Sequence, residues 1–475
     1  MRFYLGVDMG TSSIKASLVD ETGLCVESFR RPASVMNPRE GFFEVDPEAV
    51  WWSGFVSVCR EALSVVDAAD ISALCVSSVC GSFVPVTPST YPLPLRSAIL
   101  YGIDRRSASI ASELNSLWGE DFLKKKLGGA FTTHSIFPKI LWLKRNEPDI
   151  YEAARFVSSF NFVSARLTGV ASWDYPTAFG GLMLDAETLS YPEWFLRRHG
   201  IDLEKLPPLG PGVGVLGAVT AAASMETGLR EGTRVMRGAC DVNAEAMAVG
   251  AVAPGTAAAV FGSTMSLLLN TEQPVPVDGF VPGVSLMPGV WRVGAATASG
   301  GLTMDWIRKI VGDRVVKDGA PTGIMFIPYL DGARTPFNDP AASGAFLGLR
   351  SSHGPDDLAR AVGESLGYEL AMLIEIIERS YSFPEILDVS GGLTHINWLM
   401  RVVADVTGRT LRVHEHDASF GDARIAMLAD TSAGLLPSPV PAATVEPGPR
   451  SSEYRPYRSE FARSSFMYSR RNLGV

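Results

Sequence analysis

The sequence predicts an α/β protein made of two similar domains, and three observations support this fold class. Apolar, β-branched segments typical of strands alternate with amphipathic segments typical of helices. Two apolar runs joined by a short turn of glycine and hydroxyl residues occur twice, at residues 3–19 and 256–269. The chain, with 475 residues, is also longer than a single hydrophobic core usually supports.

The first two predicted strands, residues 3–7 and 16–19, flank the segment Asp8-Met-Gly-Thr-Ser-Ser-Ile-Lys15. A carboxylate at a strand end, followed by glycine, small hydroxyl residues and lysine, predicts a tight hairpin whose backbone N–H groups can face a phosphate. An ordinary hairpin explains the same residues, because Gly10 can supply the turn while Lys15 is solvated. This segment alone leaves both interpretations open.

The next segments continue the alternation of strands and helices. Asp46-Pro47 predicts a helix start, with a capping carboxylate and proline at the first helical position, and the amphipathic pattern runs to residue 66. Residues 71–79 are mostly apolar and β-branched, which predicts a buried strand. A strand over 98–101 and helices over 107–117 and 138–146 follow. This order favours α/β over all-α.

A Pro/Gly-rich stretch over residues 206–217 predicts a loop or a crossing between domains. It contains Gly212-Val-Gly214-Val-Leu-Gly217, which matches the dinucleotide pattern Gly-x-Gly-x-x-Gly. Two prolines precede the pattern and no predicted strand leads into it, so the context that gives the pattern its meaning is missing. The sequence also lacks the Gly-x-x-x-x-Gly-Lys-Ser/Thr motif of P-loop proteins. We therefore predict neither a Rossmann domain nor a P-loop fold.

The second half contains the other hairpin and an acidic helix start. Gly262-Ser263-Thr264 forms the predicted turn of the hairpin over 256–269, and two such hairpins could hold a triphosphate with backbone donors. Asp241 follows a predicted strand at 234–236 and begins an Ala-rich helix, so capping that helix is a sufficient explanation for it. A carboxylate at a helix N-terminus also stays ionised, and near a phosphate site it could take a proton from an attacking hydroxyl.

Composition narrows the class of function. Hydrophobic residues make up 46% of the chain and charged residues 20%, which is typical of a well-buried globular enzyme. The net charge of −9 argues against nucleic acid or an anionic membrane as the main partner and favours a small metabolite. The N-terminus runs directly into a predicted strand, and no apolar run approaches the roughly 18 residues of a membrane span. Five cysteines without a Cys-x-x-Cys pair fit buried thiols in a reducing compartment, so we expect a cytoplasmic protein.

Taken in order, a series of segments resembles the FGGY carbohydrate kinases, in particular their xylulokinase-like branch, over nearly the whole chain. The segments are Asp8-Met-Gly-Thr-Ser-Ser-Ile-Lys15, Gly41-Phe-Phe-Glu-Val-Asp-Pro-Glu48, Ala98-Ile-Leu-Tyr-Gly-Ile-Asp-Arg-Arg106, Pro138-Lys-Ile-Leu-Trp-Leu-Lys144, Arg166-Leu-Thr-Gly169, Asp241, Phe261-Gly-Ser-Thr264, Phe326-Ile-Pro-Tyr-Leu-Asp-Gly-Ala-Arg-Thr-Pro336, Asn338-Asp-Pro340, Ser390-Gly-Gly392 and Ala418-Ser-Phe-Gly-Asp-Ala423. So many matches in order are far more specific than any one motif.

The resemblance implies two duplicated actin/hexokinase-like (ribonuclease H-like) domains with ATP and Mg²⁺ in a central cleft. Residues 1–236 would carry the sugar side and one phosphate hairpin, and residues 237–475 the nucleotide side. Asp241 would contact the sugar and act as the general base that deprotonates the attacking hydroxyl. Asp8 would organise Mg²⁺, through water, since Mg²⁺ keeps several waters in such sites.

The same resemblance implies a further set of binding residues. Those meeting the nucleotide or its phosphates are Gly10, Thr11, Ser12, Ser13 and Lys15 from one domain, and Gly262, Ser263, Thr264, Gly300, Gly301, Gly391 and Gly392 from the other. Those on the sugar side are Cys80, Gly81 and Asp104. For the glycines, turn geometry is a comparably good explanation.

One departure from the family concerns the sugar pocket. Xylulokinases usually carry Met-His-Gly after the strand that corresponds to residues 75–79, whereas this chain has Cys80-Gly81-Ser82. A histidine that lines the sugar pocket is therefore absent from this position. The substrate is the inference that this departure affects most.

The resemblance implies ATP-dependent phosphorylation of D-xylulose to D-xylulose 5-phosphate, a step of xylose metabolism, by a homodimer. Alternative substrates are ribulose, ribitol, glycerol and gluconate. Alternatives from other classes are a sugar or nucleotide sensor that lost activity and a chaperone-like or filament-forming ATPase. The presence of Asp8, Lys15 and Asp241 disfavours the sensor, and the segments at 166–169 and 328–336 favour a sugar kinase over the ATPases.

Overall fold

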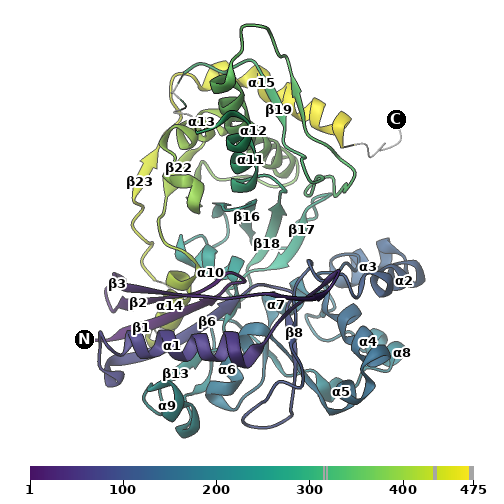
Figure 1. Cartoon of the computed structure of the whole chain (residues 1–475), viewed down its shortest axis with the longest axis vertical. Coiled ribbons are helices and arrows are strands. Elements are labelled where there is room, and N and C mark those ends of the chain that lie inside the picture. Colours follow the sequence, from purple (N-terminus) through teal and green to yellow (C-terminus); the bar gives the residue numbers. More distant parts are fainter. Residues whose placement is uncertain (314–315, 317–318, 432–435, 470–475) are drawn as a thin grey trace. The chain divides into compact units, whose positions relative to one another are not determined.

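The computed structural model describes residues 1–313, 316, 319–431 and 436–469 (Figure 1). It divides into two compact units, which are considered separately. Unit 1 comprises Met1–Ala248, Gly283–Gly289 and His416–Pro439, and unit 2 comprises Val249–Pro282, Val290–Glu415 and Val440–Val475. The domain boundary expected after residue 236 stays a prediction.

Unit 1 is built on a mixed sheet with the strand order β12-β13-β6-β1-β2-β3, and β14 also pairs with β6. The strands are β1 (Phe3–Met9), β2 (Ser13–Asp20), β3 (Cys25–Pro32), β6 (Ile71–Ser78), β12 (Val215–Ala218), β13 (Arg234–Met236) and β14 (Ala239–Cys240). β1 pairs with β2 antiparallel and with β6 parallel. The predicted hairpin over residues 3–19 and the strand predicted over residues 71–79 are therefore confirmed.

Both faces of β1 are covered, and its sequence explains how. Every residue of β1 is buried. Leu5 and Val7 point to one face, where they join a core cluster that includes Phe55 and Phe160. Gly6 points to the other face, where a side chain would collide with the carbonyl oxygen of Ser419. The glycine lets a helix approach the strand at backbone distance.

The rest of unit 1 consists of a second sheet, a short strand pair and helices. The second sheet has the order β4-β5-β8-β7-β9, with β4 (Met36–Arg39), β5 (Phe42–Val45), β7 (Phe83–Val86), β8 (Ala98–Ile99) and β9 (Arg155–Ser158), and β10 (Trp173–Asp174) pairs with β11 (Leu209–Gly210). The helices are α1 (Ser53–Ala62), α2 (Ala108–Trp118), α3 (Glu120–Leu127), α4 (Ile136–Asn146), α5 (Pro148–Ala153), α6 (Ser159–Thr168), α7 (Tyr175–Gly180), α8 (Glu193–His199), α9 (Ala221–Thr227), α10 (Asp241–Ala248) and α14 (Ala418–Met427).

Two expectations for unit 1 need correction. The helix predicted to run from Asp46-Pro47 to residue 66 begins as expected, with Asp46 accepting hydrogen bonds from the N–H groups of Glu48 and Ala49. It forms a π-helical segment over Pro47–Trp52, continues as α1 and ends at Ala62.

The stretch over residues 206–217 lies wholly within unit 1, where β12 pairs with β13, so its interpretation as a crossing between domains is wrong. Pro and Gly mark a loop without specifying which elements it joins.

Unit 2 is organised around a sheet with the order β17-β18-β16-β15-β21-β22-β23. The strands are β15 (Ala257–Phe261), β16 (Met265–Thr271), β17 (Val281–Val284), β18 (Trp291–Ala296), β21 (Ile386–Ser390), β22 (Thr410–Val413) and β23 (Ala443–Val445), and β19 (Met325–Ile327) pairs with β20 (Ala345–Leu347). The helices are α11 (Gly301–Val311), α12 (Pro355–Glu378), α13 (Asn397–Thr407) and α15 (Ser451–Tyr468). β15 and β16 form the second predicted hairpin, which is confirmed.

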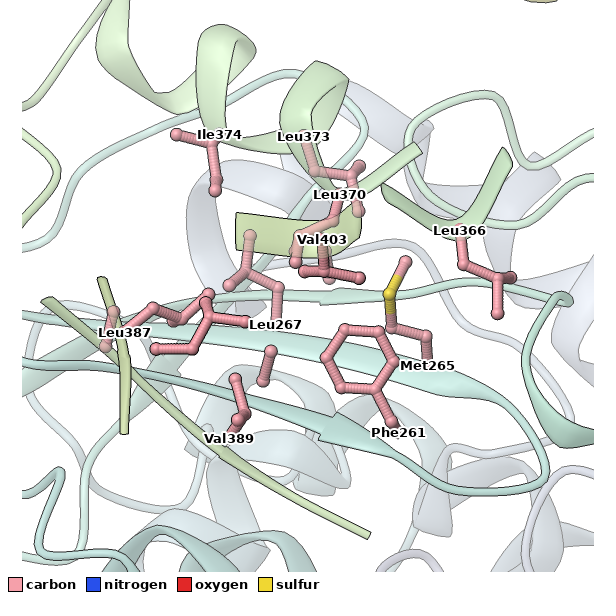
Figure 2. Close-up of a cluster of buried hydrophobic side chains, with 14 of the residues drawn as sticks. Phe261, Met265, Leu267, Leu366, Leu370, Leu373, Ile374, Leu387, Val389 and Val403 are labelled. Atoms are coloured by element: carbon pink, nitrogen blue, oxygen red, sulfur yellow. The ribbon is translucent and has the colours of Figure 1, made fainter. Parts of the chain in front are cut away.

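The core of unit 2 lies between this sheet and α12 and α13. Figure 2 shows Leu366, Leu370, Leu373 and Ile374 of α12 and Val403 of α13 above strand residues that include Leu267 and Val389. The α12 residues fall at positions i, i+4, i+7 and i+8, so they share one face of the helix. With two sheet-containing units, the predicted α/β class is confirmed.

Candidate active site

The β1–β2 hairpin places Asp8 and Lys15 opposite one another. The two residues form a cross-strand pair, and the turn is closed by a 3.0 Å hydrogen bond from the N–H of Gly10 to the carbonyl of Ser13. Thr11 and Ser12 form the tip. The Asp8 side chain is buried. The hairpin therefore presents a carboxyl group and an ammonium group side by side, next to a short turn.

Asp241 lies at the start of α10, where the end of β14 positions it. Cys240 is the register partner of Ser78 on β6, so Asp241 follows directly from the central sheet of unit 1. Its Oδ1 accepts a hydrogen bond of 2.8 Å from the N–H of Val242, the next residue along the chain. A capping side chain accepts from an N–H two or three residues further on, and Asp241 is itself the first residue of α10, so the contact predicted for a cap is not the one it makes. Burial raises the pKa of Asp241, while the Val242 N–H, His134 and the Cys80 N–H oppose this shift.

α14 brings two further carboxylates to the same region. The Nζ atom of Lys15 lies 3.1 Å from Oδ2 of Asp417, whose Oδ1 also accepts the Ser419 N–H at 3.0 Å, at the start of α14. The Oγ atom of Ser77 donates to Oδ2 of Asp422 at 2.6 Å. α14 packs against α10 at backbone distance, because a side chain at Gly421 would collide with the carbonyl group of Ala244.

The electrostatics of this cluster favour a bound cation. Burial, reinforced by the charge of Asp241, raises the pKa of Asp8 to about 7 even though Lys15 opposes the shift. Burial and the charges of Asp241 and Asp8 raise the pKa of Glu245, one turn after Asp241 on α10, to about 8. The pKa of Asp417 is lowered, since Lys15 and Ser419 outweigh its burial. These carboxylates repel one another, and an added positive charge would relieve that repulsion.

The described residues of this cluster do not supply a complete set of side-chain ligands for a metal ion. Among the residues that the structure describes, no three His, Cys, Asp or Glu side chains are arranged to hold a metal ion. Mg²⁺ is commonly bound by one or two carboxylates together with water and substrate phosphates. The residues present therefore fit a magnesium ion that arrives with a nucleotide.

The residues predicted on the sugar side fall into two groups. Cys80 and Gly81 follow β6, and the Cys80 N–H contributes to the environment of Asp241. Asp104 is fully buried, and its carboxylate accepts hydrogen bonds from the Phe43 N–H and from the guanidinium of Arg106, at 2.8 to 3.0 Å. The structure thus gives Asp104 a set of internal partners that hold its segment in place.

In unit 2, the predicted glycine loops converge on the β15–β16 turn. The N–H of Gly301 donates to the carbonyl of Gly262 at 2.8 Å, and the N–H of Leu302 donates to that of Ser263 at 3.0 Å. A β-carbon at Gly300 would lie 2.8 Å from the backbone of Thr264.

Gly391 packs against the same turn. Its φ is +101°, and a β-carbon there would lie 2.6 to 2.9 Å from backbone atoms of Phe261. The β15–β16 turn, the start of α11 and the end of β21 therefore form one contiguous backbone surface, to which Gly262, Ser263, Thr264, Gly300, Gly301, Gly391 and Gly392 all belong.

Sequence reasoning missed several residues of the unit 1 cluster. Glu245 lies four residues after Asp241, so helical periodicity could have placed it on the same face of that helix. Asp417 directly precedes a segment that resembles the family, Ala418–Ala423, which was the available signal for it. Lys139 is a clearer omission. It is fully buried and its Nζ donates to the carbonyl of Gly81 at 2.6 Å, a contact that no spacing in the sequence indicates.

Comparison with known proteins assigns the class of this fold and site. Residues 3–248 match the N-terminal domain of the FGGY family of carbohydrate kinases, and residues 257–429 match its C-terminal domain. The chain therefore belongs to the FGGY family of carbohydrate kinases and is a sugar kinase, an enzyme that transfers phosphate to an alcohol group. The predicted family, enzyme class and actin/hexokinase-like fold are confirmed. Carbohydrate kinases use ATP as the phosphate donor.

Individual relatives extend along nearly the whole chain. It is 27% identical to the xylulose kinase of Escherichia coli K12, over 97% of this chain and 98% of that protein. It is 28% identical to the glycerol kinase of Chloroflexus aurantiacus, over 86% and 85%. The crystal structure of the xylulose kinase from Rhodospirillum rubrum has a TM-score of 0.89 and 24% identity, covering 98% of this chain and 99% of that one.

No helix in the described part of the chain is both long and apolar enough to cross a bilayer.

Proposed function

We propose that this kinase transfers the γ-phosphate of Mg-ATP to D-xylulose, giving D-xylulose 5-phosphate. The observation that carries the proposal is the convergence of Asp8, Lys15 and Asp241 in unit 1, from a hairpin and a helix start that are far apart in sequence. The similarity to xylulose kinases over nearly the full chain supports this substrate.

In this proposal Asp241 is the general base. Its carboxylate accepts the proton of the sugar hydroxyl that attacks the phosphorus, and its raised pKa makes it a better proton acceptor than an ordinary aspartate. Phosphoryl transfer depends mostly on positioning and on stabilising charge. The Lys15 ammonium and the N–H groups of Thr11 and Ser12, at the tip of the turn, are donors that unit 1 could offer to a phosphate.

Asp8 is the residue we assign to magnesium. Glu245 lies in the same region, where a bound cation would favour loss of the proton that its raised pKa retains. Mg²⁺ would neutralise phosphate charge as the transfer proceeds. The glycine loops around the β15–β16 turn of unit 2 would bind the nucleotide, since backbone without side chains permits close approach.

A kinase for another small polyol is the second candidate, favoured by the similarity to a glycerol kinase and by the absence of a histidine at residue 81. The test is ADP release from Mg-ATP with D-xylulose, ribulose, ribitol, glycerol and gluconate as acceptors. We expect the highest kcat/KM with D-xylulose. A higher value with another acceptor would reassign the substrate, and release with none of them would favour a sensor.

A further inference from the structure

The side-chain position of residue 81 is filled by a histidine from elsewhere in the chain. His134 lies in the loop before α4. A β-carbon placed on Gly81 would lie 2.9 Å from both Cε1 and Nε2 of the His134 ring and 2.8 Å from the His134 carbonyl oxygen. Real β-carbons do not make such contacts, so the imidazole occupies space that any side chain at residue 81 would need.

The segment around Gly81 and the helix that follows His134 are joined by a contact that does not involve the imidazole: the buried Nζ of Lys139 donates to the carbonyl of Gly81 at 2.6 Å. The loop that carries His134 is also attached to a third segment, since Thr133 donates from Oγ1 to the carbonyl of Gly102 at 2.8 Å. Gly81 has a φ of +80°, a conformation that glycine adopts freely. The residues on either side of His134 in sequence thus fix the position of its ring.

The same two segments border Asp241. The charged form of His134 lies near enough to Asp241 to favour its ionised state, and the Cys80 N–H, beside Gly81, donates to the same residue. His134 itself is only partly buried, so part of its surface is open to solvent. An imidazole can donate one hydrogen bond and accept another, which suits the hydroxyl groups of a polyol.

We propose that His134 is the sugar-contacting histidine of this kinase, supplying a hydrogen bond to a substrate hydroxyl near the one that Asp241 deprotonates. The inference rests on the proposed function. It also accounts for the departure in the family pattern, because glycine at residue 81 and histidine at residue 134 together return an imidazole to that place in the pocket.

The test compares His134→Gln and His134→Ala with the wild type and with a control, His353→Gln. His353 lies in unit 2, where its Nδ1 accepts the Arg350 N–H at 3.1 Å. For the best acceptor of the panel, we expect KM to rise about 10- to 100-fold in the alanine variant, because a buried hydrogen bond is lost. We expect a smaller rise with glutamine, an unchanged KM for ATP in both, and wild-type values in the control.

A substrate lacking one hydroxyl provides the second measurement. If His134 contacts a hydroxyl, then for one deoxy analogue the His134→Ala substitution should cause little further loss, because the contact is already missing. A sugar KM within about twofold of wild type in both variants would overturn the proposal. The same holds if the effects of His134→Ala and of the missing hydroxyl on KM are fully additive for every analogue. If the wild type phosphorylates no acceptor, the proposed function itself fails, which the wild-type assay reveals directly. A lowered melting temperature would identify a variant that misfolds. If His134→Ala misfolds, the sugar KM of His134→Gln tests the proposal.

Discussion

Lys15 and Asp417 form an ion pair that joins the β1–β2 hairpin to the start of α14, with Nζ 3.1 Å from Oδ2. The Lys15 side chain is 33% exposed and that of Asp417 is 42% exposed, so the pair is open to solvent. An exposed pair of this kind contributes at most about 1 kcal/mol to stability. We infer that the pair matters for catalysis, because it holds the Lys15 ammonium beside the β1–β2 turn.

Replacing Lys15 should therefore impair catalysis much more than folding. We expect Lys15→Met to lower kcat/KM for ATP by about 100-fold or more, since a charged hydrogen bond to phosphate is lost. The melting temperature should change little. Lys126→Met is the matched control, because the Lys126 ammonium lies in the same unit and forms a long ion pair with Glu187, at 3.9 Å. Equal losses in the two variants would contradict the role of Lys15.

Asp241→Asn tests the general base. The amide oxygen of asparagine can still accept the Val242 N–H, so the helix start and ATP binding should survive. We expect kcat to fall roughly 10²- to 10⁴-fold, the usual contribution of a positioned base. Asp185→Asn provides a control, because Asp185 also accepts backbone N–H groups, those of Glu187 and Thr188. A turnover near the wild-type value for Asp241→Asn would exclude the proposed mechanism.

Glu245 should make the stability of the ligand-free protein depend on pH. Its pKa is raised to about 8 by burial and by Asp241 and Asp8, so the folded state retains a proton that the unfolded chain releases at a lower pH. Stability attributed to this group is present below its ordinary pKa and is lost as pH rises towards about 8.

We therefore expect Glu245→Gln to be more stable than wild type at pH 9, by about 1–3 kcal/mol, and close to it at pH 5. Urea unfolding at both pH values measures this difference. A constant offset between the two proteins across the pH range would rule out the raised pKa as its origin.

The glycine loops of unit 2 allow a comparison between adjacent residues. Gly391→Ala should lower the melting temperature clearly, by an amount corresponding to about 1–3 kcal/mol, because φ is positive and the new methyl group would meet the backbone of Phe261. At Gly392, no heavy atom of the described residues lies within 4 Å of an added β-carbon, apart from the chain neighbours. Gly392→Ala should therefore melt close to wild type. Similar losses in both variants would contradict this description of the turn.

Magnesium alone should have little effect on thermal stability. The described residues include no ready set of three metal-binding side chains, so the ion is expected to bind together with ATP. Melting curves with Mg²⁺, with ATP and with both should show a large shift only for the combination. A strong shift with Mg²⁺ alone would indicate a metal site formed by the protein.

Local sequence patterns predicted the parts of the site that each depend on a few neighbouring residues. The hairpin at Asp8–Lys15 and the helix start at Asp241 both follow from short-range preferences for turns and caps. Asp417 escaped prediction because nothing local shows that α14 packs on α10. The position of His134 over Gly81 joins residues 53 apart and depends on a buried lysine. Such pairings arise only when the whole unit folds.

The contact between Gly6 and α14 also sets a limit on when the enzyme can become active during its synthesis. β1 is made long before the helix that covers one of its faces, which begins at Ala418. A ribosome adding about 5–20 residues per second therefore spends some tens of seconds between the two. Throughout that interval the nascent hairpin lacks both its cover and the carboxylate that pairs with Lys15. Premature termination before α14 would leave an exposed sheet face for chaperones to bind, rather than a shorter kinase.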